Sequence, residues 1–182
     1  MSQARINYRT NARKALEVIL WCAAKKPKVD FHTILKVLFF ADVAHLNDYG
    51  RPIVGDDYVA LPRGPVPQTT YDILKGDPLI RDALQLDHLP FTVVGGYRIE
   101  AHRPPDFDLL AESDLAALDV AWAKCAHLAF SERSAVSHQH PAWQNARKAG
   151  RHLMDYADFL EGENLAPERI KDIAEFAADL RV

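Results

Sequence analysis

The segment from Leu35 to Gly76 constrains the fold more than any other part of the chain. An apolar, helix-forming run ends at Gly50, a residue type that readily takes the left-handed conformation that closes a helix. An extended stretch follows, and then Gly-Pro-Val-Pro at residues 64–67. Each proline fixes its own φ and keeps the preceding residue out of the helical region, so we expect a stiff corner. A new helix can open at Pro67 and end at Gly76.

Composition indicates one domain with an ordinary core. The chain has 182 residues, of which 48% are hydrophobic, and we predict a single domain over residues 1–182. The net charge of −3, with mixed signs, argues against nucleic acid as a partner. No apolar run approaches the ~20 residues that a membrane span needs, so no membrane partner is expected. Cys22 and Cys125 lie in apolar helical patterns, which favours reduced core thiols and a cytoplasmic protein.

Hydrophobic spacing predicts a mainly α fold, a compact helical domain with a small antiparallel β hairpin. The hairpin is expected where Phe91–Val94 and Tyr97–Ala101 flank Gly95-Gly96, as in a two-residue type I′ turn. Because an isolated hairpin is marginally stable, it must lie on the helical core or pair with an expected strand at Tyr58–Ala60. The expected helices cover residues 7–25, 31–49, 67–75, 78–84, 113–130, 131–137, 141–149, 153–160 and 167–180.

Asp42 and His45 are the first candidates for chemistry. They lie three residues apart on one helix and so share a face. A metal would accept such a pair, and so would a general base oriented by a carboxylate. The simpler interpretation is an acid–imidazole hydrogen bond that ties the helix to the following loop. No third ligand lies at a matching spacing, and we therefore favour the structural role.

A second candidate is the pair His138 and His140, which lies at a helix junction. These imidazoles could join Asp42, His45 and Cys125 around zinc if the fold brought them together. Capping and packing of the neighbouring tryptophan explain them more simply. A metal-dependent enzyme using Asp42, His45 and His138 is thus kept as an alternative, and the preferred prediction is no enzyme, no metal and no cofactor.

The remaining sequence patterns do not indicate catalysis or DNA binding. The sequence lacks the nucleotide-binding, zinc-protease and serine-hydrolase motifs that carry a defined mechanism. The basic residues near the proline corner alternate with aspartates, and no predicted helix is rich in Arg, Lys, Asn and Gln. A DNA-binding autorepressor is therefore a weaker alternative. Four aromatic residues could anchor a protein partner, although any one of them could equally fill the core: Tyr49, Tyr58, Tyr71 and Trp143.

An ordered series of motifs resembles the Panacea domain, the SocA-like antitoxin family of bacteria and their phages. The series spans most of the chain, and its order and separations make it specific. The matching residues are Leu35–Asp42 (as K-x-L-x-F-A-D), His45, Tyr49–Ile53, Gly55, Tyr58–Ala60, Gly64–Pro67, Tyr71, Ser137-His138 and Trp143.

The resemblance implies an antitoxin that is encoded beside an unrelated toxin and neutralises it by direct binding. For some members it also implies delivery of the toxin to an ATP-dependent protease. We expect the partner surface to include the stiff corner Gly64–Tyr71 and nearby Tyr58, since a preorganised surface loses less entropy on binding. The candidate partner-binding residues are Asp42, His45, Tyr49, Tyr58, Gly64, Pro65, Val66, Pro67, Tyr71, His138 and Trp143.

Overall fold

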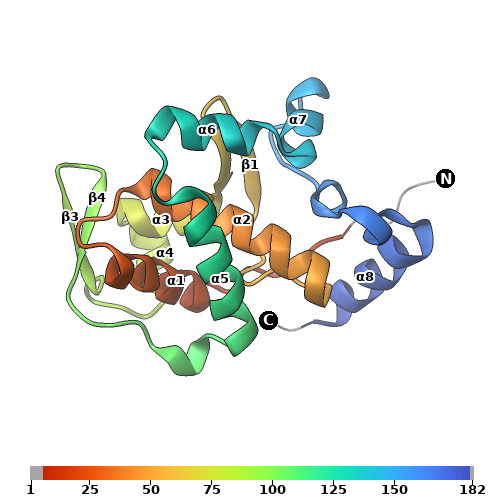
Figure 1. Ribbon diagram of the computed structural model, residues 1–182. Coiled ribbons are helices and arrows are strands. Elements are labelled where there is room, and N and C mark those ends of the chain that lie inside the picture. Colours follow the sequence, from red (N-terminus) through yellow and green to blue (C-terminus); the bar gives the residue numbers. More distant parts are fainter. Residues whose placement is uncertain (1–5, 181–182) are drawn as a thin grey trace.

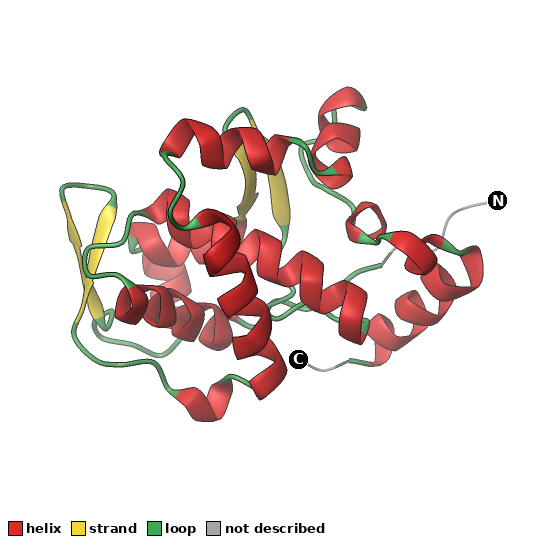
Figure 2. Ribbon diagram, in the orientation of Figure 1, coloured by secondary structure: helices red, strands yellow, loops and turns green. Residues whose placement is uncertain are grey.

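The computed structural model describes residues 6–180 and confirms a mainly helical fold with two small antiparallel sheets (Figures 1 and 2). The α-helices of the described part are α1 (Ala12–Lys25), α2 (Phe31–Tyr49), α3 (Gln68–Lys75), α4 (Pro78–Ala83), α5 (Glu112–Cys125), α6 (Phe130–His138), α7 (Pro141–Lys148) and α8 (Pro167–Asp179). The other elements are the strands β1 (Tyr58–Leu61), β2 (Gly64–Pro67), β3 (Phe91–Val94) and β4 (Arg98–Ala101), and the 3₁₀ helices η1 (Phe107–Leu109), η2 (Tyr156–Phe159) and η3 (Gly162–Leu165).

Helix α2 is the centre of the molecule. Asp30 caps its start, where the carboxylate accepts a hydrogen bond from the backbone N–H of Thr33 at 2.8 Å. Gly50 ends it with φ +71°, as the sequence predicts. The helix packs against α5, β2, α6 and α3, and Figure 1 shows α5 crossing it on one side. Because it is covered on most sides, α2 is apolar around nearly its whole circumference.

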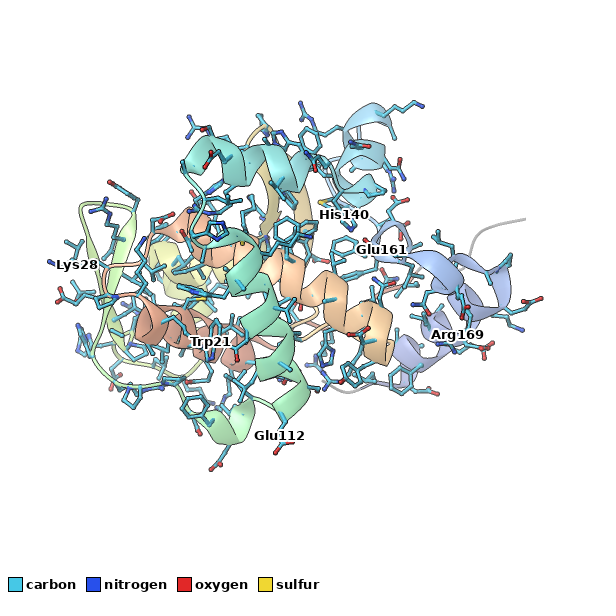
Figure 3. All side chains as sticks on the ribbon, viewed as in Figure 1. Trp21, Lys28, Glu112, His140, Glu161 and Arg169 are labelled. Carbon is cyan, nitrogen blue, oxygen red and sulfur yellow. The ribbon has the colours of Figure 1, made fainter. Side chains whose placement is uncertain are left out.

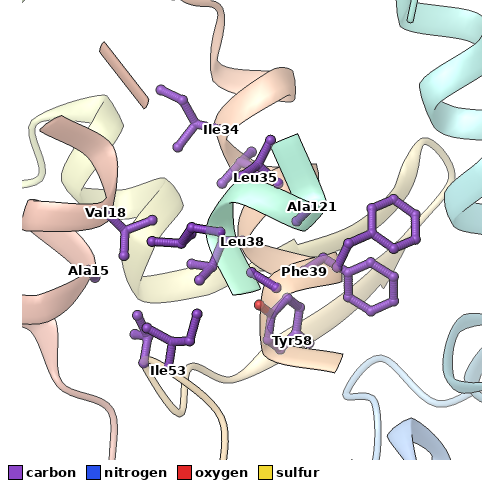
Figure 4. Close-up of a cluster of buried hydrophobic side chains, with 14 of the residues drawn as sticks. Ala15, Val18, Ile34, Leu35, Leu38, Phe39, Ile53, Tyr58 and Ala121 are labelled. Carbon is purple, nitrogen blue, oxygen red and sulfur yellow. The ribbon is translucent and has the colours of Figure 1, made fainter. Parts of the chain in front are cut away.

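The core lies where α2 meets α1, α5 and the segment before β1. Figure 4 shows Leu38 and Phe39 of α2 beside Val18, Ile53 and Tyr58, all of them buried. The rings of Phe39 and Tyr58 meet edge to face with centroids 5.7 Å apart. Burying one such large apolar side chain contributes about 1.5–3 kcal/mol to stability. The packing of Tyr58 on Phe39 therefore fixes the start of β1 against α2 in the core.

The segment Gly64–Pro67, expected from the sequence to be a stiff corner, is a short strand in the structure. Residues 64–67 form β2 and pair with β1 in antiparallel register, from Tyr58 opposite Pro67 to Leu61 opposite Gly64. Alternate residues of a strand direct their N–H groups away from the partner, and the two prolines are tolerated at such positions on an edge strand. The other edge of β1 is also bonded, since the N–H of Ala60 donates to the carbonyl of His152 at 2.9 Å.

The second hairpin differs from the prediction in its loop. Val94 lies opposite Arg98, so three residues rather than two connect β3 and β4. The hairpin does not join β1, which leaves the other predicted arrangement, in which it rests on the helical core. The hairpin is bonded at its outer edge to the chain around the start of α2: the N–H of Ile99 donates to the carbonyl of Val29 at 3.0 Å, and the N–H of Phe31 donates to the carbonyl of Tyr97 at 2.8 Å.

Two predicted helices have clearly different limits in the structure, and a third is not an α-helix. Helix α1 begins at Ala12 rather than at residue 7, because Asn11 caps it. Helix α5 covers Glu112–Cys125 rather than 113–130, since the carboxylate of Asp114 bonds back to the N–H of Ala111 and starts the helix earlier. Residues 153–160 are not an α-helix: 152–154 bond to β1, and only a 3₁₀ turn follows.

Two further expectations can be compared with the structure. Cys22 and Cys125 are buried and free, as predicted for core thiols. Within residues 6–180, no helix combines the length and the apolar character needed to cross a lipid bilayer.

Candidate partner-binding site

Asp42 holds the loop between α2 and β1. Its side chain is fully buried and accepts hydrogen bonds from the N–H of Ile53 at 2.7 Å, the N–H of Val54 at 3.4 Å and the hydroxyl of Tyr58 at 2.8 Å. Burial raises the pKa of this carboxyl to about 7, although the three donors act in the opposite direction. Asp42 of α2 therefore holds both the loop at Ile53 and Val54 and the start of β1 at Tyr58.

His45 connects the same loop to α5. Its Nδ1 lies 2.8 Å from the carbonyl oxygen of Arg51, and its Nε2 lies 3.0 Å from the hydroxyl of Ser113 and 3.2 Å from Asp114. The predicted tie to the following loop is confirmed, but the acid beside the imidazole is Asp114 and not Asp42. The ammonium of Lys14 also contacts Asp114, at 2.6 Å, so this carboxylate joins three segments.

The two later histidines have separate roles. His138 stacks on Trp143 with ring centroids 3.9 Å apart, and the indole N–H donates to the carbonyl of Leu61 at 2.9 Å, at the end of β1. The Nδ1 of His140 accepts a hydrogen bond from the first turn of α7, and its Nε2 lies 3.3 Å from Glu161 (Figure 3). Both histidines thus pack and cap at the junction of α6 and α7, as the sequence favours.

The described residues do not bring the candidate metal ligands together. Asp42 and His45 direct their polar atoms to different backbone groups, and His138 lies against Trp143. Within residues 6–180, no three side chains of the types His, Cys, Asp and Glu form a group that could hold a metal ion.

Lys36 of α2 packs closely against Gly64 at the start of β2. The Lys36 ammonium is fully buried and donates to the carbonyl of Pro65 at 2.6 Å. It forms no ion pair with any carboxylate of the described residues. Gly64 has φ +107°, and a Cβ there would lie 2.8 Å from Lys36 Cε. Burial, and then the charge of Arg133, lower the pKa of Lys36 to about 7.

Replacing Lys36 by methionine should change the pH dependence of stability. Below pH 7 the wild-type amine is charged in both the folded and unfolded states, and folding bears the full cost of burying it. Between pH 7 and 10.5 the folded form loses its proton first, so wild-type stability rises. Methionine does not titrate, so the variant lacks this rise. The difference in unfolding free energy, Lys36→Met minus wild type, should therefore fall by roughly 3 kcal/mol from pH 7 to 9.5.

Urea titrations at several pH values measure this difference, and exposed Lys148→Met is the matched control. A difference that is independent of pH would show that Lys36 keeps an ordinary pKa in the folded protein.

Only part of the predicted site reaches the surface. Gly64, Pro65, Val66 and Pro67 are buried, whereas Tyr71 of α3 is half-buried. Tyr49 is 56% exposed, but it lies at the opposite end of α2, where its ring packs at a tilt against His45 with centroids 4.6 Å apart. The structure therefore joins Tyr71 and the β1–β2 turn on one face and separates Tyr49 from them.

A cavity of about 770 Å³ lies beside Tyr71. It is bounded by the first turns of α2, the β1–β2 turn, α3, the β3–β4 loop and the start of α6. Its volume is within the range of pockets that hold small ligands or anchoring side chains. Most of its lining lies outside the residues predicted to bind a partner, and includes Arg63, Tyr97, Phe130 and Arg133. The available signal was weak: a lysine, Lys36, within the apolar run Ile34–Ala41 of α2.

The comparisons with known proteins identify the family. The family described as antitoxin SocA-like, Panacea domain, matches residues 34–144, which are more than half of the chain. This range runs from within α2 to within α7 and contains the loop held by Asp42, both sheets and the cavity lining except Asp30, Phe31 and His32. No curated protein and no solved structure gives a match. The chain thus belongs to the Panacea family of SocA-like antitoxins.

Proposed function

We propose that this protein neutralises a cognate protein toxin, encoded by a neighbouring gene, by binding it directly and without catalysing a reaction. The family match carries this proposal. The contacts of the signature residues support it, because Asp42, His45 and Trp143 direct their polar atoms to backbone groups and so support a surface. A protein that works by holding another protein requires such a preorganised scaffold.

The proposed contact face is centred on Tyr71 and the β1–β2 turn. Tyr58 is 2% exposed, so it lies below this face and does not contact a partner. Its hydroxyl donates to Asp42 and holds β1 against α2. Both edges of β1 are bonded, one to β2 and the other to residues 152–154. The turn at Pro62 and Arg63 is exposed at the end of this fixed pair of strands. A partner can therefore bind there without first ordering the loop.

Co-expression with the neighbouring gene tests the function. Growth should be arrested by the toxin alone and restored by this protein, and the two chains should co-purify. Failure to restore growth and failure to co-purify would together contradict the proposal.

Tyr71→Ala should weaken toxin binding about 10- to 100-fold, as is typical when an aromatic anchor is truncated. Calorimetry with the purified toxin measures the affinity, and a melting curve of the variant confirms that it is folded. Tyr49→Ala is the matched control on a remote surface and should bind normally. Equal affinity of all three proteins, with a hydrogen-exchange footprint wholly away from residues 61–75, would reject this face.

Delivery of the toxin to an ATP-dependent protease in the cytoplasm is a second step of the proposal. If it occurs, the half-life of the toxin should shorten when this protein is co-expressed, and only in cells that retain the protease. An unchanged half-life, together with full neutralisation, would reduce the mechanism to binding alone.

A further inference from the structure

Three pairs of a cation and an aromatic ring surround the mouth of the cavity. The guanidinium of Arg63 lies 5.4 Å from the ring of Phe130, and that of Arg98 lies 5.0 Å from the ring of Tyr97. The third pair is Lys75 over Tyr71, at 4.6 Å. Tyr97 and Phe130 are 52% and 46% exposed, and both line this cavity, so their rings are accessible to a partner there. The three pairs come from different segments of the chain.

The charge of this cavity is opposite to that of the whole protein. The chain carries −3, yet the lining holds five cationic residues and one carboxylate, Asp30. The carboxylate of Asp30 already accepts hydrogen bonds from Thr33 at the start of α2, and it lies 3.5 Å from Arg133. Lys75 is paired with Asp72 at 2.9 Å.

Three of the five cationic residues in the cavity lining, two exposed arginines and one buried lysine, have no acidic partner among the described residues. Within residues 6–180, no carboxylate lies within ion-pair distance of Arg63, Arg98 or Lys36. Arginines stacked on aromatic rings keep the planar edge of the guanidinium available, and that edge matches a carboxylate through two parallel hydrogen bonds. Stacking also restricts the side chain before binding, so less entropy is lost on contact.

We propose that the cavity receives an acidic segment of the toxin, in which carboxylates reach Arg63 and Arg98 and an apolar side chain enters between them. The apolar part of the lining, which includes Leu35, Val66 and Leu128, suits such a side chain. This inference rests on the proposed function and specifies the chemistry of the partner. It accounts for a cavity whose lining holds five cationic residues and one carboxylate in a protein with a net charge of −3.

The double variant Arg63→Glu/Arg98→Glu tests the proposal. Affinity for the product of the neighbouring gene should fall at least about 30-fold, because reversed rim charges repel the acidic segment. Raising the salt concentration should weaken the wild-type complex and should not weaken that of the double variant to the same extent. Arg169→Glu is the matched control: Arg169 is exposed on α8, far from the β3–β4 hairpin, and should bind as wild type does (Figure 3).

Rescue makes the test specific. In the complex of the double variant, replacing acidic residues of the toxin with lysine one at a time should identify a position that restores affinity. Unchanged affinity of the double variant for a toxin that wild type binds would overturn this inference and leave the proposed function intact. Absence of wild-type binding would overturn both. A rise in melting temperature with inorganic phosphate that the double variant abolishes, with unchanged toxin affinity, would assign the cavity to a free anion instead.

Discussion

Replacing Asp42 with alanine should lower the free energy of unfolding by about 3–5 kcal/mol. The change leaves two amide N–H groups, those of Ile53 and Val54, and the hydroxyl of Tyr58 without an acceptor in the core. Each orphaned buried donor costs about 1–3 kcal/mol. Since total stability is typically about 5–15 kcal/mol, the melting temperature should fall by roughly 10 °C.

Asp48→Ala provides the control for this prediction. Asp48 lies on the same helix, but its side chain is exposed, so its removal should change stability by less than about 0.5 kcal/mol. Urea unfolding of the two variants beside wild type measures both values. If Asp42→Ala were as stable as Asp48→Ala, the buried carboxylate would not be the residue that holds the loop to α2.

Replacing Gly64 with alanine should destabilise the protein by about 3 kcal/mol or more. The backbone there has φ +107°, which strains any residue with a Cβ. The new methyl group would also contact Lys36 and Ser137. Neither neighbour can move freely, because the Lys36 ammonium is bonded to Pro65 and the Ser137 hydroxyl to Ser134. Overpacking of this kind costs about 1–3 kcal/mol beyond the backbone strain.

Gly96→Ala separates these two contributions. Gly96 has φ +80°, and a Cβ there meets no atom within 4 Å, so only backbone strain of about 1 kcal/mol is expected. Thermal melting of both variants gives the comparison. Equal losses of stability would mean that the contact of β2 with α2 and α6 is not tight.

The helices were predictable where local chemistry sets their ends. Asp30 and Asp77 offer capping carboxylates, and Gly50 and Gly76 take the left-handed conformation that ends a helix. The hydrophobic spacing of α2 also indicated its burial. Residues 153–160 were predicted wrongly, because pairing with β1 across a long sequence separation overrides their local helical preference.

The cavity and its charge could not be read from the sequence. Arg63, Arg98 and Phe130 are distant along the chain and meet only because β1–β2, the β3–β4 hairpin and α6 pack around the first turns of α2. The proline motif was recognisable, but its pairing as a strand depends on register with Tyr58–Leu61, which no local pattern specifies. The contact of His45 with the following loop was predictable from its place on the helix, whereas the acid beside it, Asp114, lies in α5 and has no signal near it in sequence.

A titration of toxin activity with this protein is the most direct test of the central claim, which is that the chain neutralises by binding and not by turnover. At toxin concentrations well above the dissociation constant, residual activity should fall linearly and reach zero at a fixed molar ratio close to a whole-number stoichiometry. Complete loss of toxin activity at a small fraction of one equivalent would reveal catalysis, and no loss at a large excess would show that this protein does not hold the toxin.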